Sequence, residues 1–372
     1  MDKVRFGIIG VGNMGMYHIN YFNTLENASI EAICDADAKK LDTAAAKAAG
    51  AKKFSAYQDL MSSGAVDAVL IATPHYQHPE IAIAAFEKGL HVLCEKPEAV
   101  TVKEARRMNA AADAHPNVKF SLNFQMRTSP LLKKVRELVL GGDLGEMTRI
   151  TWVVTTWFRT NAYYASGGWR ATWAGEGGGV LINQCPHNLD QLHWLTGMMP
   201  NRITAVAHLG KTHPIEVEDE VSAILEYENG AIGHFIATTG EAPGSDRLEI
   251  AGQHGKLVVD HGNVTFQKLG KSVKELIEGP ERSPKLEIEN LTIDAGEYVE
   301  RHSIITQNFV NSILKDEPLI APGEDGIKGL EIGNAMLMSG ITRKPVELPL
   351  DGAAYESLLD ELKLMSNDQM KV

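Results

Sequence analysis

Lys96 is a residue whose type and place in the sequence could do chemistry. It lies in Glu95-Lys96-Pro97, directly after the apolar run 89–94, which predicts a buried strand. Burying an ammonium group costs free energy unless something pairs with it, so we expect Lys96 to meet a carboxylate, a ligand hydroxyl or a cofactor. A lysine that snorkels from a strand end is the simpler interpretation of Lys96 alone. The other motifs of the chain favour the chemical role.

A second group of reactive residues lies in the glycine-rich run 177–190. Asn183 and His187 are four residues apart, which on a helix places both side chains on one face. Pro186 should kink this helix or start a new segment. Removing hydride from a secondary alcohol needs a group that accepts the hydroxyl proton, and histidine suits that work. Lys96 would stabilise the developing alkoxide. A hydrogen-bonded helix histidine is the alternative.

Glycines 177–179 come just before this pair, and we expect them to let the backbone approach a ligand closely.

Most of the tryptophans lie just before the glycine-rich run, with tyrosines and arginines between them. Flat aromatic faces beside hydrogen-bonding groups suit a polyhydroxylated ring, which has apolar C–H faces and hydroxyl edges. Large aromatic residues that fill a domain interface are an equally good interpretation. The candidate substrate contacts in this segment are Trp157, Tyr163 and Trp169.

The first third of the chain alternates short apolar runs with helical segments, which predicts a doubly wound parallel sheet. Thr101 and Glu104 form a capping box at the start of one helix. The predicted strands are 4–9, 29–34, 66–72, 90–94 and 118–122, and the predicted helices are 14–25, 38–49, 80–88 and 102–114.

A glycine-rich turn follows the first predicted strand and opens the first predicted helix. In this G-x-G-x-x-G context Gly10 permits the turn, Gly12 lets the backbone approach a pyrophosphate, and Gly15 lets helix and strand pack. Asn13 and Met14 complete the turn at the helix amino terminus, which would face the phosphates. The motif predicts a dinucleotide site.

Asp35 ends the second predicted strand, where an acidic side chain can accept both hydroxyls of the adenosine ribose. Its charge repels a 2′-phosphate, so NAD is favoured over NADP, although Lys39 and Lys40 lie nearby. Thr73 and Pro74 end the third predicted strand, with His78 following. Their position at the carboxyl ends of the strands makes them candidate cofactor neighbours.

The rest of the chain shows longer alternating strands, which predict a mainly antiparallel open sheet in an α+β domain. We place the Rossmann domain at 1–123 and the substrate-binding and oligomerisation domain at 124–372. Residues 270–294 are predicted to form a surface excursion. The predicted strands are 147–158, 203–208, 221–227, 231–238, 247–251, 256–260, 264–268 and 345–348, and the predicted helices are 130–140, 298–314, 326–339 and a final one.

Composition narrows the classes of partner. The net charge is −12, without a long basic run, which argues against nucleic acid and anionic membranes. Neither a membrane-spanning run nor a signal peptide is recognisable, so we predict a cytoplasmic protein. Cys34, Cys94 and Cys185 lack metal-ligand spacing and predict reduced thiols without a metal site.

Taken together, these motifs resemble the Gfo/Idh/MocA family of oxidoreductases over nearly the whole chain. The resemblance rests on the glycine-rich turn, Thr73-Pro74 with His78, Glu95-Lys96-Pro97, Asn123 with Arg127, the run through His187 and Asp190, Val217-Glu218-Asp219-Glu220 and Gly323-Glu324-Asp325-Gly326.

The resemblance implies a Rossmann domain and an α+β domain whose open sheet forms a homo-dimer or homo-tetramer contact. It implies a bound nicotinamide cofactor and a sugar, inositol or glycoside substrate. Lys96 and His187 would be the catalytic pair, and Glu95 and Lys96 would border the nicotinamide ribose. Arg127 would contact substrate, and the Lys96-Pro97 peptide would be cis.

Asn183 departs from the family pattern, because inositol dehydrogenases usually carry an aspartate there. Asparagine can hold a histidine tautomer but adds no charge, so His187 should be less basic. The residue favours glucosides or other hexose derivatives, including oxidation of a 3-hydroxyl, over inositol. A glycosidase that uses NAD transiently and a non-enzymatic nicotinamide sensor are the alternatives to a dehydrogenase.

Overall fold

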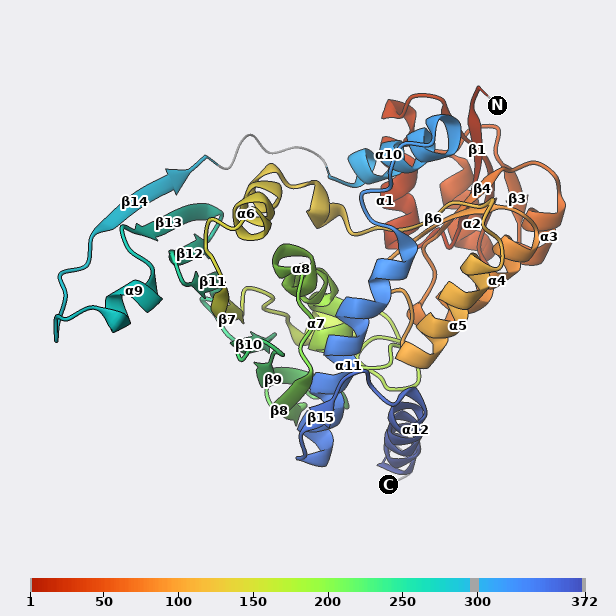
Figure 1. Ribbon diagram of the computed structural model, residues 1–372. Helices are drawn as coiled ribbons and strands as arrows, with labels where there is room; N and C mark the ends of the chain where they lie inside the picture. The colour runs from red at the N-terminus through yellow and green to blue at the C-terminus, as the bar shows by residue number, and fades with distance from the viewer. Residues whose placement is uncertain (1, 295–300, 370–372) are drawn as a thin grey trace. The chain divides into compact units, whose positions relative to one another are not determined.

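A six-stranded parallel sheet forms the centre of the first part of the molecule in this computed structural model, which describes residues 2–294 and 301–369 (Figure 1). Its strand order is β3-β2-β1-β4-β5-β6, and this order reverses between β1 and β4. Ligands bind at such switch points, outside the carboxyl ends of the strands. The strands are β1 (Val4–Ile9), β2 (Ala28–Cys34), β3 (Lys52–Phe54), β4 (Ala68–Ile71), β5 (His91–Cys94) and β6 (Phe120–Leu122).

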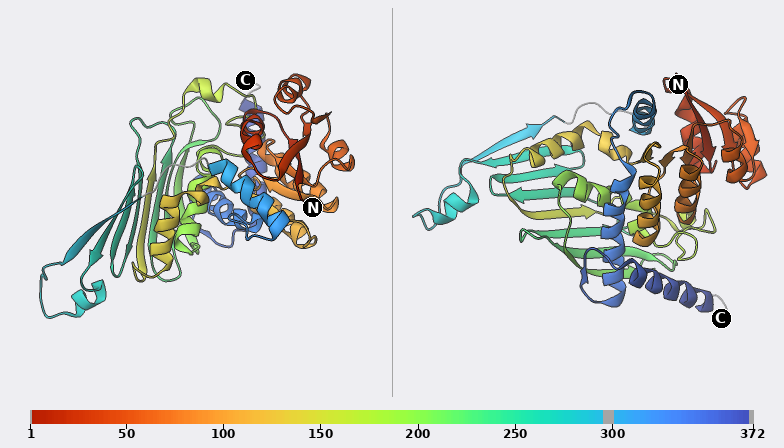
Figure 2. Two further views of the ribbon diagram at one scale, coloured as in Figure 1. Left: turned by 90° about the horizontal axis from the view of Figure 1, so that it is seen from above. Right: turned by 45° about the vertical axis from the view of Figure 1, so that its right-hand side comes forward.

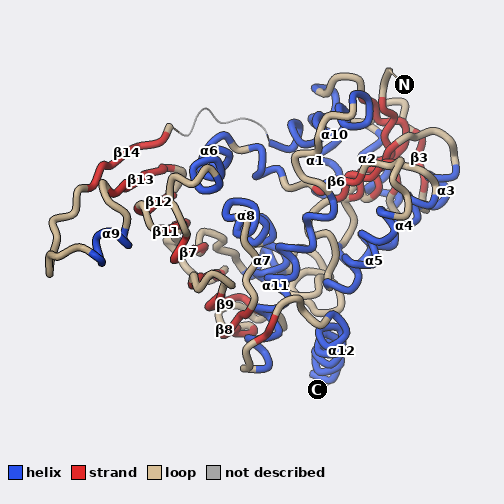
Figure 3. Tube along the Cα trace, in the orientation of Figure 1, coloured by secondary structure: helices blue, strands red, loops and turns tan. Residues whose placement is uncertain are grey.

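Helices alternate with these strands along the chain, as predicted for a doubly wound sheet (Figure 3). Thr101 caps its helix by accepting a hydrogen bond from the Glu104 backbone N–H, at 3.3 Å. β3 and α3 were not predicted, because β3 is a three-residue edge strand without apolar alternation and α3 is short. The helices are α1 (Asn13–Tyr21), α2 (Ala38–Ala45), α3 (Tyr57–Ser62), α4 (His78–Glu87), α5 (Val102–Asp113) and α10 (Arg301–Lys315).

A late segment of the chain returns to this first sheet. The chain divides into a first unit, Met1–Thr128 with Val299–Leu330, and a second unit, Ser129–Tyr298 with Glu331–Val372. In α10, Phe309 is fully buried, and its ring lies 6.1 Å from the ring of Phe6 in β1. The predicted domain boundary at 123/124 remains a prediction, and it did not include this return.

The second unit contains a nine-stranded sheet with the order β14-β13-β12-β11-β7-β10-β9-β8-β15. It is mainly antiparallel as predicted, but β7 and β10 pair in parallel. The strands are β7 (Met147–Val154), β8 (Arg202–Leu209), β9 (Glu218–Glu226), β10 (Ile232–Thr238), β11 (Asp246–Gly252), β12 (Gly255–Asp260), β13 (Asn263–Leu269), β14 (Ile288–Ile293) and β15 (Val346–Glu347).

Helices cover one face of the nine-stranded sheet (Figure 2). Gly340 approaches Ala207 of β8 so closely that an added Cβ would lie 2.5 Å from the alanine side chain, and Gly333 similarly approaches Leu189. These contacts seat α11 on the sheet and on α8. The helices of this unit include α6 (Pro130–Leu140), α7 (Asn161–Tyr164), α8 (Pro186–Thr196), α9 (Val273–Glu278), α11 (Gly326–Thr342, begun in the first unit) and α12 (Gly352–Gln369).

The charged segment 270–294 contains the short helix α9 and the edge strand β14, which extends the sheet. Ile277 is 78% exposed there, in keeping with the predicted surface excursion. The helix predicted from residue 298 is present as α10 from Arg301, and residues 298–300 lie outside the described part. Among the described residues, no helix combines the length and the apolar character needed to cross a membrane.

Candidate active site

The glycine-rich turn follows β1, and its three glycines meet different surroundings. An added Cβ at Gly10 would lie 2.6 Å from the Ala72 carbonyl oxygen, and one at Gly15 would lie 2.0 Å from the Gly10 carbonyl oxygen. At Gly12 an added Cβ would meet nothing within 4 Å. Gly10 and Gly15 are therefore needed for packing, whereas Gly12 leaves open space beside α1. Asn13 and Met14 form the first turn of α1.

Asp35 holds this turn from the end of β2. Its carboxylate accepts a hydrogen bond from the Val11 backbone N–H, at 2.9 Å, and another from the Asp37 N–H, also at 2.9 Å. Asp37 in turn caps α2, and Lys40 lies 4.0 Å from it. The predicted ribose-binding carboxylate therefore lies at the turn, and the nearby Lys40 side chain is directed toward Asp37.

Thr73 lies just after β4, and His78 begins α4. Among the described residues, the buried Thr73 hydroxyl has no hydrogen-bond partner, which suits a site that a bound cofactor would complete. The His78 ring nitrogens lie 2.9 Å from the Thr73 carbonyl oxygen and 2.8 Å from that of Pro97. Burial lowers the pKa of His78 and favours its neutral ring. His78 thus connects the segments that follow β4 and β5. Because its two ring nitrogens face these carbonyl oxygens, they would not contact the cofactor directly. Pro74 begins the turn between Thr73 and His78.

Glu95 is a buried carboxylate with its own partners. It lies 2.7 Å from His18 Nε2 of α1 and accepts a hydrogen bond of 2.6 Å from the Asn123 amide. Burial alone would raise the pKa of Glu95, but the hydrogen bond and charge of His18, together with His302 and Asn123, lower it to about 2. The carboxylate anchors the strand end on which half-buried Lys96 stands. The Lys96-Pro97 peptide is cis, as predicted.

Arg127 is almost fully buried in the first unit, with 1% of its surface exposed. Its guanidinium lies 2.7 Å from Asp325 and 5.5 Å from the centre of the Phe124 ring. Arg127 therefore joins η3 (Gln125–Thr128) to the turn before α11. Its predicted contact with substrate remains a prediction.

The glycine run of the second unit leads into a π-helix, η4 (Val180–Gln184), and α8 begins afresh at Pro186, as expected for a proline that starts a new segment. An added Cβ at Gly179 would lie 2.0 Å from the Glu218 carbonyl oxygen. The explanation from ligand approach is therefore wrong for Gly179, because strand β9 occupies that space. π-Helical turns often occur at functional sites.

Glu218, at the start of β9, holds the π-helix in place. Its fully buried carboxylate accepts hydrogen bonds from the backbone N–H groups of Gly179, at 2.9 Å, and Leu181, at 3.1 Å. Burial raises the pKa of Glu218 to about 7 against the lowering effect of these hydrogen bonds. The backbone that precedes His187 is thereby tied to the sheet, and His187 itself is half-buried in the first turn of α8.

Asn183 lies at the centre of a polar cluster, which we call the Asn183 cluster: Tyr163, Arg170, Glu176, Asn183 and Gln184. The Asn183 amide donates to Glu176, and its oxygen accepts from Gln184, at 3.0 Å, and from the Tyr163 hydroxyl, at 3.3 Å. Arg170 donates to the same hydroxyl at 2.9 Å. Neither Glu176 nor Gln184 was predicted as a site residue, although Gln184 adjoins Asn183 in the sequence.

The tryptophans of this segment divide into two groups. Trp152 and Trp173 are buried, so both are packing residues and not candidates for contact with a ligand. Trp157 and Trp169 are only half-buried, with the guanidinium of Arg159 5.3 Å from the Trp157 ring and that of Arg170 4.8 Å from the Trp169 ring. These two therefore remain the candidates for contact with a sugar ring.

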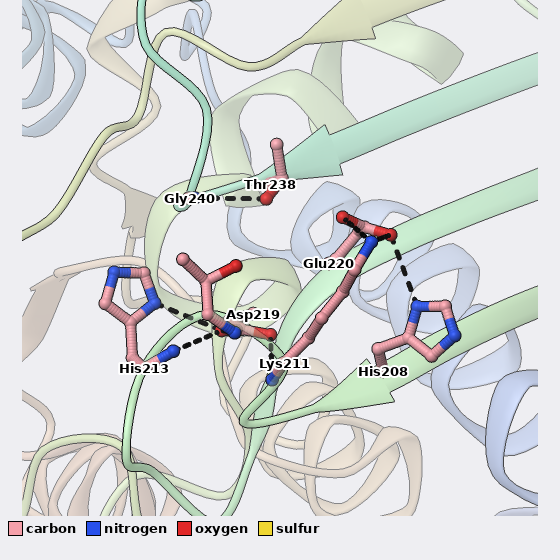
Figure 4. A network of polar contacts seen from close by, with 8 residues as sticks. His208, Lys211, His213, Asp219, Glu220, Thr238 and Gly240 are labelled. Atoms are coloured by element: carbon pink, nitrogen blue, oxygen red, sulfur yellow. Dashed lines mark hydrogen bonds and ion pairs between the residues drawn. The ribbon is translucent and has the colours of Figure 1, made fainter.

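Asp219 holds the loop between β8 and β9 (Figure 4), and this loop contacts the residues around α7, the helix that carries Tyr163. Asp219 accepts hydrogen bonds from the backbone N–H groups of residues 211–213 and lies 3.1 Å from His213 Nδ1. The other His213 nitrogen lies 2.9 Å from the Arg159 carbonyl oxygen, and its ring lies 5.0 Å from that of Tyr164. The acidic run at 217–220 was noticed in the sequence, but His213 was missed because nothing local marks it.

The sheet order and the glycine-rich turn held by a carboxylate define a dinucleotide-binding Rossmann fold. Residues 4–124 match the NAD-binding Rossmann fold of the oxidoreductase family GFO_IDH_MocA, and residues 132–258 match the GFO/IDH/MocA C-terminal domain. This chain belongs to the Gfo/Idh/MocA family and is an NAD(P)-dependent oxidoreductase.

Individual relatives support this assignment. The rhizopine catabolism protein MocA of Rhizobium meliloti is 30% identical, over 63% of this chain and 70% of its own length. Inositol 2-dehydrogenase of Corynebacterium glutamicum is 29% identical, over 62% of this chain and 65% of its own length. The WlbA dehydrogenase of Bordetella pertussis, solved with NADH and UDP-GlcNAcA, has 28% identity and a TM-score of 0.79, covering 94% of this chain and 100% of its own.

Replacing Gly12 with alanine tests the cofactor site. The added methyl meets no protein atom within 4 Å, so the fold should persist while the methyl meets the pyrophosphate. We expect NADH affinity, measured by calorimetry, to fall by about tenfold or more. Gly168→Ala is the matched control, since an added Cβ there also meets nothing within 4 Å. Equal NADH affinity in both variants would contradict this assignment.

The raised pKa of Glu218 predicts a pH-dependent stability. The folded protein binds this proton more tightly than the unfolded chain, so stability is lost as pH rises from the ordinary carboxyl range through about 7. Relative to Glu218→Gln, the wild-type free energy of unfolding should fall by up to about 3 kcal/mol between about pH 5 and 8. Urea unfolding at both pH values measures it. Parallel pH profiles for the two proteins would refute the prediction, and exposed Glu278→Gln is the control.

Proposed function

We propose that this protein is an NAD-dependent dehydrogenase that oxidises a secondary hydroxyl of a sugar, glycoside or cyclic polyol. The Asn183 cluster carries the proposal, because amide, phenol and guanidinium groups beside half-buried tryptophans suit the hydroxyl edges and C–H faces of such a ring. The similarity to an inositol 2-dehydrogenase and to a dehydrogenase solved with UDP-GlcNAcA supports this substrate class. The 3-hydroxyl of a glucoside is the specific case that we favour.

The cofactor proposal rests on the first unit. The open space at Gly12, the unpartnered Thr73 hydroxyl and Asp35 fit a dinucleotide whose ribose diol is free, so we propose NAD rather than NADP. When bound, NAD would accept the hydride that leaves the alcohol carbon. Lys96 stands at the strand end that Glu95 anchors, where a nicotinamide ribose would bind in the family.

The proton chemistry is assigned to Lys96 and His187. His187 would accept the hydroxyl proton, and the ammonium group of Lys96 would stabilise the developing alkoxide. Asn183 would orient His187. Tyr163, Trp157 and Trp169 are the proposed substrate contacts, together with Arg127 if its ion pair with Asp325 opens.

A substrate panel tests the function. Purified protein with NAD or NADP and a set of hexoses, inositols and glucosides should produce reduced cofactor, faster with NAD. Lys96→Ala and His187→Ala should each lower kcat by about 10²-fold or more while NADH still binds. Lys88→Ala and His208→Ala, both at exposed positions, are the controls.

Two outcomes of the panel would overturn the proposal. Silence across all substrates would remove the dehydrogenase assignment, and release of aglycone without net NADH would favour a glycosidase that uses NAD transiently. The family assignment already favours an enzyme over a non-enzymatic nicotinamide sensor.

We also propose a homo-dimer or homo-tetramer formed through the nine-stranded sheet. On the face of the sheet away from the buried side chains, Val206, Ile224 and Ile232 are 43%, 45% and 38% exposed. Ile224→Glu should therefore reduce the molar mass measured by light scattering, since a charge would be buried in the contact. Ile277→Glu, on α9, should not. A monomeric wild-type protein would be decisive against the proposal.

A further inference from the structure

Glu176 is a buried carboxylate for which the proposed reaction has no role. Only 2% of its surface is exposed. One carboxylate oxygen accepts a hydrogen bond of 2.6 Å from the Ala171 backbone N–H, and the other accepts from the side-chain amide of Asn183. A carboxylate that merely closed a turn would not need the second contact.

The contact with Glu176 fixes the orientation of the Asn183 amide. The amide nitrogen must face the carboxylate, because the reversed orientation would place two oxygens together. The amide oxygen is thereby turned to Gln184 Nε2, at 3.0 Å, and the Tyr163 hydroxyl, at 3.3 Å. An amide that donates to a carboxylate is polarised, and its oxygen becomes a stronger acceptor. Asn183 therefore carries part of the effect of a negative charge.

Other charged and titratable groups lie around Glu176. Glu218 of β9 is close enough for the charge of Glu176 to contribute to its raised pKa, after burial. Glu216 accepts a hydrogen bond of 2.6 Å from the Trp173 backbone N–H. Arg170 reaches the cluster through the Tyr163 hydroxyl, at 2.9 Å. In such a buried setting the charge of Glu176 is weakly screened.

We propose that Glu176 is a positioning residue: it fixes the Asn183 amide, and its negative charge favours proton uptake by His187, which lies four residues further along the chain at the start of α8. This inference rests on the proposed function, which gives His187 its role. It also revises the expectation that asparagine leaves His187 without a charged neighbour, because the carboxylate lies one hydrogen bond behind Asn183.

Titration of His187 by NMR tests the proposal without any substrate. Histidine-labelled protein would be titrated in the wild type, Glu176→Gln and Glu216→Gln, with the His187 signal assigned by its loss in His187→Gln. Removing a negative charge destabilises the imidazolium, so Glu176→Gln should lower the pKa of His187 by about one unit. Glu216→Gln removes a different carboxylate, which also accepts a hydrogen bond from a backbone N–H, and it should leave the pKa of His187 unchanged.

The double variant Glu176→Gln/Asn183→Asp guards against a folding defect. It exchanges carboxylate and amide, so the hydrogen bond can re-form in reverse with the same net charge, and the pKa of His187 should return at least to the wild-type value. Equal shifts in Glu176→Gln and Glu216→Gln, or no recovery in the double variant, would overturn the proposal.

Kinetics separate this inference from the proposed function. With an active substrate, the acidic limb of the kcat/KM profile should move with the pKa of His187, and NADH affinity should not change. A shifted NMR titration without dehydrogenase activity would support the role of Glu176 and reject the function. Activity with an unshifted titration would do the reverse.

Discussion

Backbone N–H groups that are held by carboxylates position the loops of the candidate site. Asp35 holds the nucleotide turn, Glu218 holds the π-helix, and Asp219 holds the loop that supports α7. A buried N–H without an acceptor costs about 1–3 kcal/mol, and a charged acceptor makes a stronger bond than a neutral one. Irregular backbone can therefore be rigid here. Part of the acidic composition serves this purpose.

Close backbone approach is a second constraint, and it separates glycines that look alike in the sequence. Gly15 and Gly179 lie against backbone carbonyls and would clash with any side chain, whereas Gly12 faces open space. Only the open space at Gly12 leaves room for a ligand. A glycine-rich run therefore marks either a binding site or a crowded packing contact, and the neighbouring strand decides which.

In both units, buried polar side chains are held in place by contacts with other polar side chains. In the first unit Glu95 meets His18 and Asn123, so the strand end that carries Lys96 is tied to α1 and β6. In the second unit Glu176 meets Asn183, ahead of the helix that carries His187. The low dielectric of a protein interior strengthens the hydrogen bonds of such a network when every polar group has a partner. For the same reason, the loss of one partner is costly in free energy. In each unit a carboxylate that is itself fixed thus adjoins a candidate site residue, Lys96 in the first unit and Asn183 in the second.

The sequence by itself determined the doubly wound domain, the open mainly antiparallel sheet, the glycine-rich turn with Asp35, and the new helix at Pro186. These depend on local periodicity, on glycine spacing and on the missing proline N–H, which are all visible within a few residues. The family resemblance added the cis peptide at Pro97, and it supports the proposed roles of Lys96 and His187.

The tertiary structure decided the contacts between residues far apart in the chain. The return of α10 to Phe6, the packing of Gly179 on β9, and the contact of His213 with the carbonyl of Arg159 leave no local pattern. Glu176 and Gln184 gained a place in the site only because the turn and the π-helix bring them to Asn183. Folding chooses partners by burial and hydrogen-bond geometry in three dimensions, and a linear pattern of residue types does not record that choice.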